Sequence, residues 1–211
     1  MEIFSVKNKV VFITGASRGI GREIAIAFLK LKAVVIGVSR NENKSIKHKN
    51  YYHLVCDLKN YQAIKHATNQ ALKIKKKIDV IINNAGITEE EQKDFYKSFK
   101  SFNKTLNVNL TAPYAISHFL IKALKKNKNG GTIINLSSIA AELGLPNNPA
   151  YNSSKSGLVG LTKSLARDYG KFNINVNAVL PGYFNTDMNK KSYNNKSKRN
   201  KRSSLTMLSR W

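Results

Sequence analysis

The sequence is poor in cysteine and in acidic residues, and it has no long apolar run. Its single cysteine, Cys56, excludes an internal disulfide and is typical of proteins from a reducing compartment. No apolar stretch approaches the roughly 18 residues that a membrane-spanning helix needs. Residues 1–9 lack the basic-then-apolar layout of a leader peptide. We therefore expect a cytoplasmic protein without a membrane partner.

The acidic residues, 12 against 36 lysines and arginines, leave a formal net charge of +24. Such an excess is common in proteins that bind nucleic acid. The basic residues are spread along the chain, however, so a general compositional bias is the preferred interpretation. The exception is the Lys/Asn/Ser-rich segment from Lys190 to Arg202, which has little apolar periodicity and is expected to be poorly ordered. Nucleic-acid binding through this segment is a minor alternative.

The apolar residues, 42% of the chain, are arranged as alternating strands and helices of a single domain. Apolar runs typical of buried strands occupy residues 10–13, 34–38, 52–56, 80–83, 132–138 and 175–180. Helical periodicity occupies residues 19–31, 61–74, 102–126 and 151–169. Pro113 is expected to kink the third of these helices or to mark a bend. The alternation indicates an α/β fold with a doubly wound parallel sheet of about six strands.

Several turns follow the strands directly, and in a parallel sheet such turns line one crevice. They are the turn after Ile13, residues 83–86, Ser138 and Pro181-Gly182. In the first of them, residues 14–21, glycines let the backbone approach a pyrophosphate at a helix N-terminus. The spacing differs from the common G-x-G-x-x-G, so an ordinary glycine-rich turn is the alternative.

Tyr151 and Lys155 are four residues apart in a helical pattern, so their side chains share one helix face. A lysine ammonium beside a tyrosine favours the phenolate and lowers the pKa of the hydroxyl from about 10. We therefore expect Tyr151 to exchange a proton near neutral pH, with the Ser138 hydroxyl close by at the end of a strand.

Together these motifs resemble the short-chain dehydrogenase/reductase family from about Lys9 to Met188. The family pattern T-G-x-x-x-G-x-G is matched by Thr14, Gly15, Gly19 and Gly21, and the pattern N-N-A-G is matched by residues 83–86. The family's catalytic Asn corresponds to Asn109, and its Ser and Y-x-x-x-K correspond to Ser138, Tyr151 and Lys155. The late P-G motif is matched by Pro181-Gly182, with Thr186 following. The resemblance implies a single Rossmann-like domain over residues 1–188 and a nicotinamide cofactor.

The resemblance also implies the roles of the site residues. Tyr151 is expected to be the general acid in ketone reduction, with Lys155 lowering its pKa and bonding the nicotinamide ribose. Ser138 is expected to hold the substrate oxygen, Asn109 to position a water molecule in a proton relay, and Asp57 to bond the adenine. The full set of expected cofactor contacts is Thr14, Gly15, Ser17, Arg18, Gly19, Ile20, Gly21, Ser39, Arg40, Asp57, Leu58, Asn84, Ala85, Gly86, Tyr151, Lys155, Pro181, Gly182 and Thr186.

The residues after the second strand predict which nicotinamide nucleotide is used. An acidic residue there accepts a hydrogen bond from the ribose 2′-hydroxyl of NAD, whereas an arginine accommodates the 2′-phosphate of NADP. This chain has Ser39-Arg40 at that position and Arg18 in the glycine loop. Because arginine suits bidentate phosphate contacts, we expect NADP(H) to be preferred over NAD(H).

The substrate is less closely defined. Overall the chain is most similar to 3-oxoacyl-acyl-carrier-protein reductases of fatty acid biosynthesis, and its basic surface could dock an acidic carrier. A carbonyl substrate, either a small molecule or bound to a carrier protein, is therefore expected. Another ketone, a sugar or a polyol is an alternative, and an alternative of another class is a catalytically defective remnant that retains dinucleotide binding.

The resemblance stops near the carboxyl terminus. Members of the family usually continue past Pro181-Gly182 through a substrate-covering lid, another helix and a seventh strand. Residues 189–211 would then be a basic, poorly ordered remnant of the lid, and the sixth strand a sheet edge with uncovered apolar faces. The homo-oligomer expected for the family would lose contacts that the missing segment commonly supports.

Some conspicuous residues receive no chemical role. His48, His53, His66 and His118 show no metal-ligand spacing, and the place of Cys56 in a strand indicates packing. Ser137 is interpreted as a structural strand-end hydroxyl, and Glu89-Glu90-Glu91 as a solvated loop.

Overall fold

The computed structural model describes residues 5–42, 45–89 and 93–211. Met1–Phe4, part of the segment considered above for a leader peptide, and Glu90 and Glu91 of the acidic cluster lie outside the described residues. Its centre is a six-stranded parallel sheet in the order β3-β2-β1-β4-β5-β6. The strands are β1 (Val10–Thr14), β2 (Val34–Ser39), β3 (Tyr51–Val55), β4 (Val80–Asn83), β5 (Gly131–Leu136) and β6 (Ile174–Val179). The strand order reverses between β1 and β4, which confirms the predicted doubly wound, Rossmann-like sheet.

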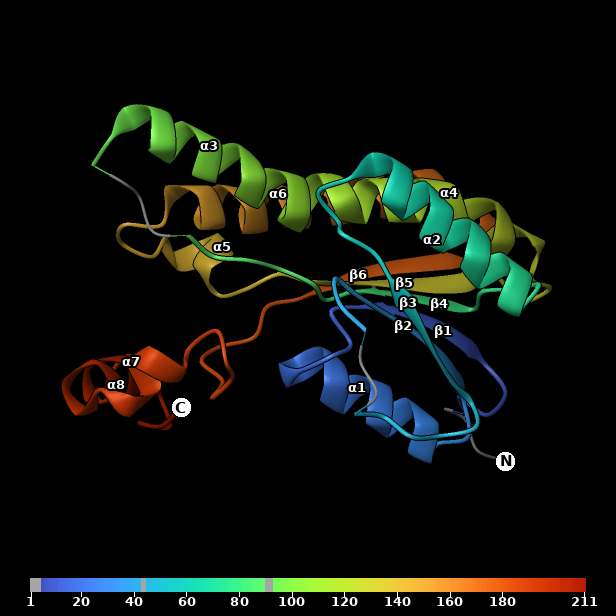
Figure 1. The fold of residues 1–211 in the computed structure, drawn as a ribbon, viewed down its shortest axis with the longest axis horizontal. Coiled ribbons are helices and arrows are strands. Elements are labelled where there is room, and N and C mark those ends of the chain that lie inside the picture. Colours follow the sequence, from blue (N-terminus) through green and yellow to red (C-terminus); the bar gives the residue numbers. More distant parts are fainter. Residues whose placement is uncertain (1–4, 43–44, 90–92) are drawn as a thin grey trace.

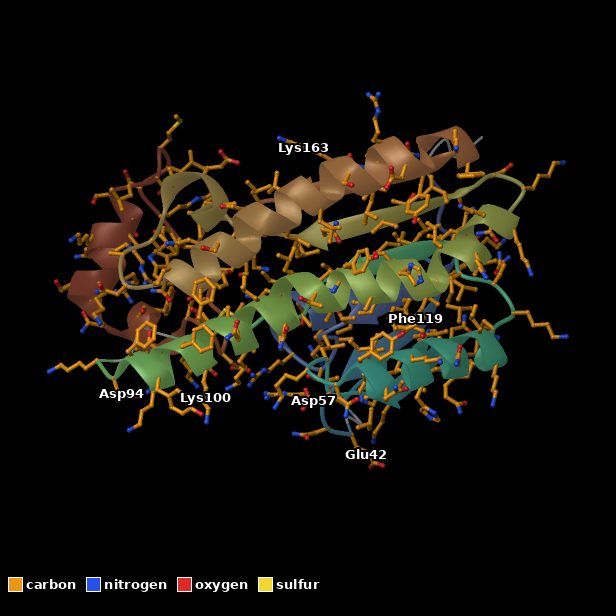
Figure 2. All side chains as sticks on the ribbon, turned by 90° about the horizontal axis from the view of Figure 1, so that it is seen from above. Glu42, Asp57, Asp94, Lys100, Phe119 and Lys163 are labelled. Carbon is orange, nitrogen blue, oxygen red and sulfur yellow. The ribbon has the colours of Figure 1, made fainter. Side chains whose placement is uncertain are left out.

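Helices cover the two faces of the sheet unequally (Figure 1). One face packs on α1 (Gly19–Lys30), and the other packs on α2 (Tyr61–Ile74), α4 (Ala112–Lys126) and α6 (Pro149–Tyr169). Alternate residues of β1 point to opposite faces of the sheet. Val11 belongs to the hydrophobic cluster beneath α1, and Phe12 belongs to the larger hydrophobic cluster on the opposite face. Figure 2 shows Phe119 of α4 directed toward α2, where its ring lies 5.4 Å from that of Tyr61.

The α1 face is incompletely covered beside β6. An apolar groove of about 400 Å³ lies there, lined by Ile20, Ile24, Phe28, Ile82, Ile134, Leu136, Val179, Pro181 and Phe184. Among the described residues, β6 is the last strand of the sheet, so this part of the chain shows the sheet edge and the open apolar face that the sequence predicts.

The helix expected over residues 102–126 is divided. α3 (Phe95–Leu106) begins earlier, where the Asp94 side chain accepts a hydrogen bond of 2.8 Å from the backbone N–H of Lys97. A π-helical turn, η1 (Asn107–Thr111), then leads into α4. Pro113 lies in the first turn of α4, directly after this π-helical turn, where its missing N–H and its ring are tolerated.

Two short helices, α7 (Lys190–Asn194) and α8 (Lys196–Ser203), occupy the basic segment, for which the sequence predicts no regular structure. Aromatic contacts between distant positions account for the difference. The Trp211 ring stacks on Tyr183 with centroids 5.3 Å apart and meets Tyr193 edge-on at the same distance. The Arg199 guanidinium lies 5.3 Å from the centre of the Tyr193 ring.

The remaining short helices are α5 (Ala140–Leu143), after β5, and η2 (Gly170–Phe172), before β6. Among the described residues, no helix has the length and the apolar character needed to cross a bilayer.

Candidate active site

A groove of about 590 Å³ crosses the carboxyl ends of the strands. Almost every site residue predicted from the sequence lines it: Gly15, Ser17, Arg18, Gly19, Ile20, Gly21, Ser39, Arg40, Asp57, Leu58, Asn84, Ala85, Gly86, Ser138, Tyr151, Lys155, Pro181, Gly182 and Thr186. Two do not, because Thr14 and Asn109 are buried behind its wall. The structure therefore brings the expected catalytic and cofactor residues to one place.

Thr14 joins the ends of β1 and β4. Its hydroxyl oxygen accepts hydrogen bonds from the backbone N–H groups of Asn84 (3.1 Å) and Ala85 (3.0 Å). In return, the Asn84 amide donates to the Thr14 carbonyl at 2.9 Å. Thr14 thus holds the floor of the groove rather than lining it.

The glycine loop brings the start of α1 against the end of β1. A Cβ atom at Gly21 would collide with the Gly15 carbonyl oxygen and with the Asn84 side chain, so only glycine allows this approach. Arg18, the N-cap residue, gives α1 no side-chain hydrogen bond, and the first turn contains no acidic residue. The positive end of the α1 dipole therefore faces the groove with no acidic residue in its own first turn, which fits the pyrophosphate of a dinucleotide.

Basic side chains surround the end of the groove near β2 and β3. The Lys59 ammonium lies 3.2 Å from the Asp57 carboxylate, and the Arg18 guanidinium lies 3.7 Å from that of Asp187. Burial raises the pKa of Asp57, but hydrogen bonds from Lys59 and the charges of Lys59 and Arg40 outweigh it, so the pKa lies below its ordinary value. Asp57 is therefore anionic at neutral pH beside two cations.

Ser138 and Tyr151 lie together at the centre of the groove. The Ser138 oxygen accepts a hydrogen bond of 3.1 Å from the N–H of Ala140, and its hydroxyl bonds to Tyr151. Burial raises the pKa of Tyr151, and the bond with Ser138 lowers it by less, so the pKa lies above its ordinary value. The predicted net lowering of the Tyr151 pKa is thus wrong for this structure, because burial outweighs the effects that favour the phenolate, and Tyr151 carries its proton at neutral pH.

The position of Lys155 explains why the pKa of Tyr151 is not lowered. Only 4% of its surface is exposed, and its Nζ atom donates a hydrogen bond of 2.6 Å to the carbonyl of Leu136 at the end of β5. The same atom lies 5.7 Å from the centre of the Tyr151 ring. Burial lowers the pKa of Lys155 to about 8. The helical spacing correctly places both residues on one face, but it does not show how deeply they are buried.

Asn109 lies in the π-helical turn and is 1% exposed. Its side-chain oxygen accepts from the N–H of Ile87 (2.8 Å), while its amide donates to the Ile87 carbonyl (2.9 Å) and to the Ser154 hydroxyl (3.0 Å). The side chain therefore anchors the loop after β4, and its role toward a water molecule stays a prediction. The Asn109 carbonyl receives no hydrogen bond from residue 113, because Pro113 has no N–H.

The loop after β4 contributes groove residues that the sequence reasoning missed. Thr88 donates a hydrogen bond of 2.9 Å to the side chain of Asn148, which links this loop to the start of α6. Glu89 accepts hydrogen bonds from Ser101 and Lys104, which lower its pKa, so it is paired rather than merely solvated. A motif search does not find these residues, because the chain folds them together from three separate segments.

The residues to which the sequence assigns no chemical role make structural contacts or are buried. The Ser137 hydroxyl donates to the carbonyl of Lys155 at 2.8 Å and fixes α6 to the end of β5. Cys56 is buried, and burial raises the pKa of its thiol to about 11. Within the described ranges, no group of three or more His, Cys, Asp or Glu side chains could hold a metal ion.

A parallel sheet with a dinucleotide loop at its switch point, facing a serine, a tyrosine and a lysine, defines a nicotinamide-dependent oxidoreductase. Residues 9–197 match the family model described as short chain dehydrogenase. The chain belongs to the short-chain dehydrogenase/reductase family. Similar proteins have been solved with NADP or with NADH bound.

Similar proteins have different substrates. The 3-oxoacyl-[acyl-carrier-protein] reductase of Buchnera aphidicola is 35% identical over 191 residues, which cover 88% of this chain and 77% of that enzyme. The 2-dehydro-3-deoxy-D-gluconate 5-dehydrogenase of Dickeya dadantii is 30% identical over 193 residues, covering 89% and 76%. A 4-hydroxyisoleucine dehydrogenase, solved with NADH, has a TM-score of 0.89 at 34% identity, covering 97% of this chain and 85% of that one.

Proposed function

We propose that the protein reduces a ketone to a secondary alcohol with NADPH, and that the substrate is a 3-oxoacyl thioester. The observation that carries this proposal is the meeting of Ser138, Tyr151 and Lys155 with the glycine loop in one groove. These side chains hold a carbonyl oxygen and supply its proton at the place where the fold receives the cofactor.

Different residues bind the substrate and transfer the proton. The Ser138 hydroxyl orients the substrate oxygen, and the protonated Tyr151 donates to that oxygen as negative charge develops on it. NADPH, when bound along the glycine loop, supplies the hydride. Lys155 in its charged form favours the phenolate that the transfer leaves behind, and its Nζ atom is held by the hydrogen bond that it donates to the Leu136 carbonyl.

The preference for NADPH follows from the charges around the end of β2. Arg18, Arg40 and Lys59 line this end of the groove, and no acidic residue directly follows β2. The first acidic residue beyond it, Glu42, is exposed, and Figure 2 shows its side chain pointing out from the rim of the molecule. These charges attract a 2′-phosphate, and among the described residues no carboxylate stands directly after β2, where one would accept a hydrogen bond from a 2′-hydroxyl.

The substrate class is proposed from the mouth of the groove. Phe184 and Met188 line the groove and expose 52% and 47% of their surfaces, so an acyl chain can pack on them. The net charge of +24 favours association with an acidic carrier protein or with the anionic coenzyme part of a thioester. A sugar-acid substrate, as the gluconate-type relative suggests, would use the cationic residues but not this apolar mouth.

NADPH oxidation with acetoacetyl-coenzyme A, measured by the loss of absorbance of the reduced nicotinamide, tests the proposal. We expect turnover with the thioester, less with a keto sugar acid, and less with NADH in place of NADPH. Turnover of the sugar acid alone would reject the thioester. Binding of NADPH without turnover of either substrate would favour the defective dinucleotide-binding protein instead.

A further inference from the structure

The side of the sheet that carries α1 contains a polar array between β2 and β3 that no catalytic role explains. The two strands are parallel, with Gly37 opposite His53 and Ser39 opposite Val55. Side chains alternate along a strand, so Ser39 and His53 lie on one face. Ser39, Arg40 and Asn41 form the turn that follows β2 and line the groove. His53 stands behind this turn, outside the groove lining.

The hydrogen bonds of His53 fix both ends of that turn. Its Nε2 atom lies 3.1 Å from the Ser39 hydroxyl oxygen and 3.1 Å from the Asn41 carbonyl oxygen. The Ser39 hydroxyl itself donates to the Asn41 carbonyl at 2.9 Å. The Nδ1 atom of His53 lies 3.2 Å from the Tyr51 hydroxyl.

The acceptors in this array determine which atoms donate. A carbonyl oxygen only accepts, so the Ser39 hydroxyl and the Nε2–H of His53 both donate toward Asn41, and the Nε2–H is shared with the Ser39 oxygen at the same distance. In the tautomer with its proton on Nε2, the ring has a lone pair at Nδ1, which accepts the proton of the Tyr51 hydroxyl. His53 is therefore an acceptor from Tyr51 behind it and a donor to the turn in front of it.

The array is joined to the glycine loop. A Cβ atom at Gly37 would collide with the Tyr51 hydroxyl and would lie 2.9 Å from the Cβ of Ala16, so glycine leaves room for the tyrosine. On the other side of β2, the backbone N–H of Gly15 donates to the Val38 carbonyl at 2.8 Å. The turn after β2 is thus held between the glycine loop and β3.

Arg40 lies between the two residues that His53 holds. Its side chain is exposed and lines the groove, so little besides the backbone of its own turn fixes the direction from which it approaches a ligand. A phosphate bound by arginine requires a defined approach of the guanidinium. A tether on Ser39 and Asn41 provides that definition without touching the phosphate.

We propose that His53 is a positioning residue that holds the Ser39–Asn41 turn in the shape that receives the 2′-phosphate of NADPH, with Tyr51 fixing its tautomer. The proposal rests on the proposed preference for NADPH. It assigns discrimination between the two cofactors to a histidine that does not contact either of them. It also predicts that His53 affects NADPH and leaves NADH nearly unaffected, since NADH has no 2′-phosphate.

Fluorescence titration of the full chain with NADPH and with NADH tests this inference in His53→Phe, His53→Gln and Tyr51→Phe. We expect His53→Phe to weaken NADPH binding by roughly five- to tenfold, the loss typical of hydrogen bonds that hold a binding group, and NADH binding by less than about twofold. His53→Gln keeps an N–H donor near the Nε2 position and should retain most of the preference. Tyr51→Phe removes only the fixing hydroxyl and should cause a smaller loss for NADPH alone.

His66→Phe is the matched control, because His66 is an exposed histidine on α2 and should change neither titration. Equal weakening of both cofactors in His53→Phe would show a merely structural role and overturn the inference, as would no change at all. If His53→Phe does not fold, Tyr51→Phe and His53→Gln decide. Wild-type protein that binds NADH as tightly as NADPH would instead reject the proposed cofactor preference.

Discussion

The Nζ atom of Lys155 donates a 2.6 Å hydrogen bond to the carbonyl oxygen of Leu136, so this lysine is fixed to the end of β5 and not to the tyrosine four residues before it. This contact places a cation where it is almost completely removed from water, and burial lowers its pKa to about 8. Placing a charge there lowers the stability of the fold, so the burial of Lys155 is consistent with the catalytic role that we propose for it.

Lys155→Met should separate activity from stability. The pKa of Lys155 falls from 10.5 to about 8, and a pKa unit corresponds to about 1.4 kcal/mol, so charging this side chain costs the folded state roughly 3 kcal/mol. We expect the variant to lose reductase activity while its free energy of unfolding at pH 7 stays equal or rises, measured by urea denaturation. A large loss of stability would show that the Leu136 hydrogen bond outweighs the cost of the buried charge.

The same lysine predicts how stability depends on pH. Because its pKa is lowered on folding, the unfolded chain binds more protons between pH 8 and 10.5, and stability rises with pH across that window. Below pH 8 the penalty is constant. The difference in unfolding free energy between wild type and Lys155→Met should therefore change between pH 8 and 10 and stay flat from pH 6 to 7.5.

The rate of ketone reduction should fall with rising pH. Tyr151 has a raised pKa and keeps its proton, whereas Lys155 loses its charge above a pKa of about 8. A pH profile of kcat/KM for NADPH-dependent reduction should therefore be level near neutrality and decline above about pH 8. A profile that rises through this range would contradict the assignment of Tyr151 as the proton donor.

Tyr151→Phe should remove most of the catalytic activity and leave NADPH binding largely intact. The phenolic proton and the hydrogen bond with Ser138 are lost, and kcat should fall by about 10²- to 10⁴-fold, the usual contribution of a general acid. Titration with NADPH should still detect binding. Tyr61→Phe, at an exposed tyrosine on α2, is the matched control and should retain full activity. Undiminished turnover by the Tyr151 variant would reject the mechanism.

Asn109→Asp should show that this side chain supports the groove. An aspartate keeps the acceptor for Ile87 N–H but cannot donate to the Ile87 carbonyl or to Ser154. Leaving such buried partners unpaired costs about 2 to 4 kcal/mol, so the melting temperature and the activity should both fall. Asn103→Asp, on the exposed surface of α3, should leave both unchanged.

Two glycine substitutions should act in opposite directions. Gly21→Ala forces a Cβ against the Gly15 carbonyl and should remove NADPH binding and lower stability. Gly160 lies in the exposed middle of α6 with no atom near its missing Cβ, so Gly160→Ala should stabilise the protein by about 0.5 to 1 kcal/mol. Thermal unfolding with and without NADPH measures both effects.

The sequence predicts the sheet and the positions of the groove residues because both depend on local patterns. The helix predicted at 61–74 occurs as Tyr61–Ile74, since its apolar period is uninterrupted. The π-helical turn before Pro113 escapes prediction, because one added residue hardly changes a helical period. The direction of the Tyr151 pKa shift escapes it too, since burial comes from segments far apart in the chain. For the same reason, the sequence gives no sign that Trp211 stacks on Tyr183 and so helps to hold α7 and α8.

The bare apolar groove beside β6 has a practical consequence for anyone who handles the purified protein. A net charge of +24 makes copies of the chain repel one another in dilute buffer. Added salt screens that repulsion but does not weaken apolar attraction. Clustering should therefore increase with ionic strength, and a low-salt buffer at low concentration is the condition in which single molecules persist long enough to be assayed.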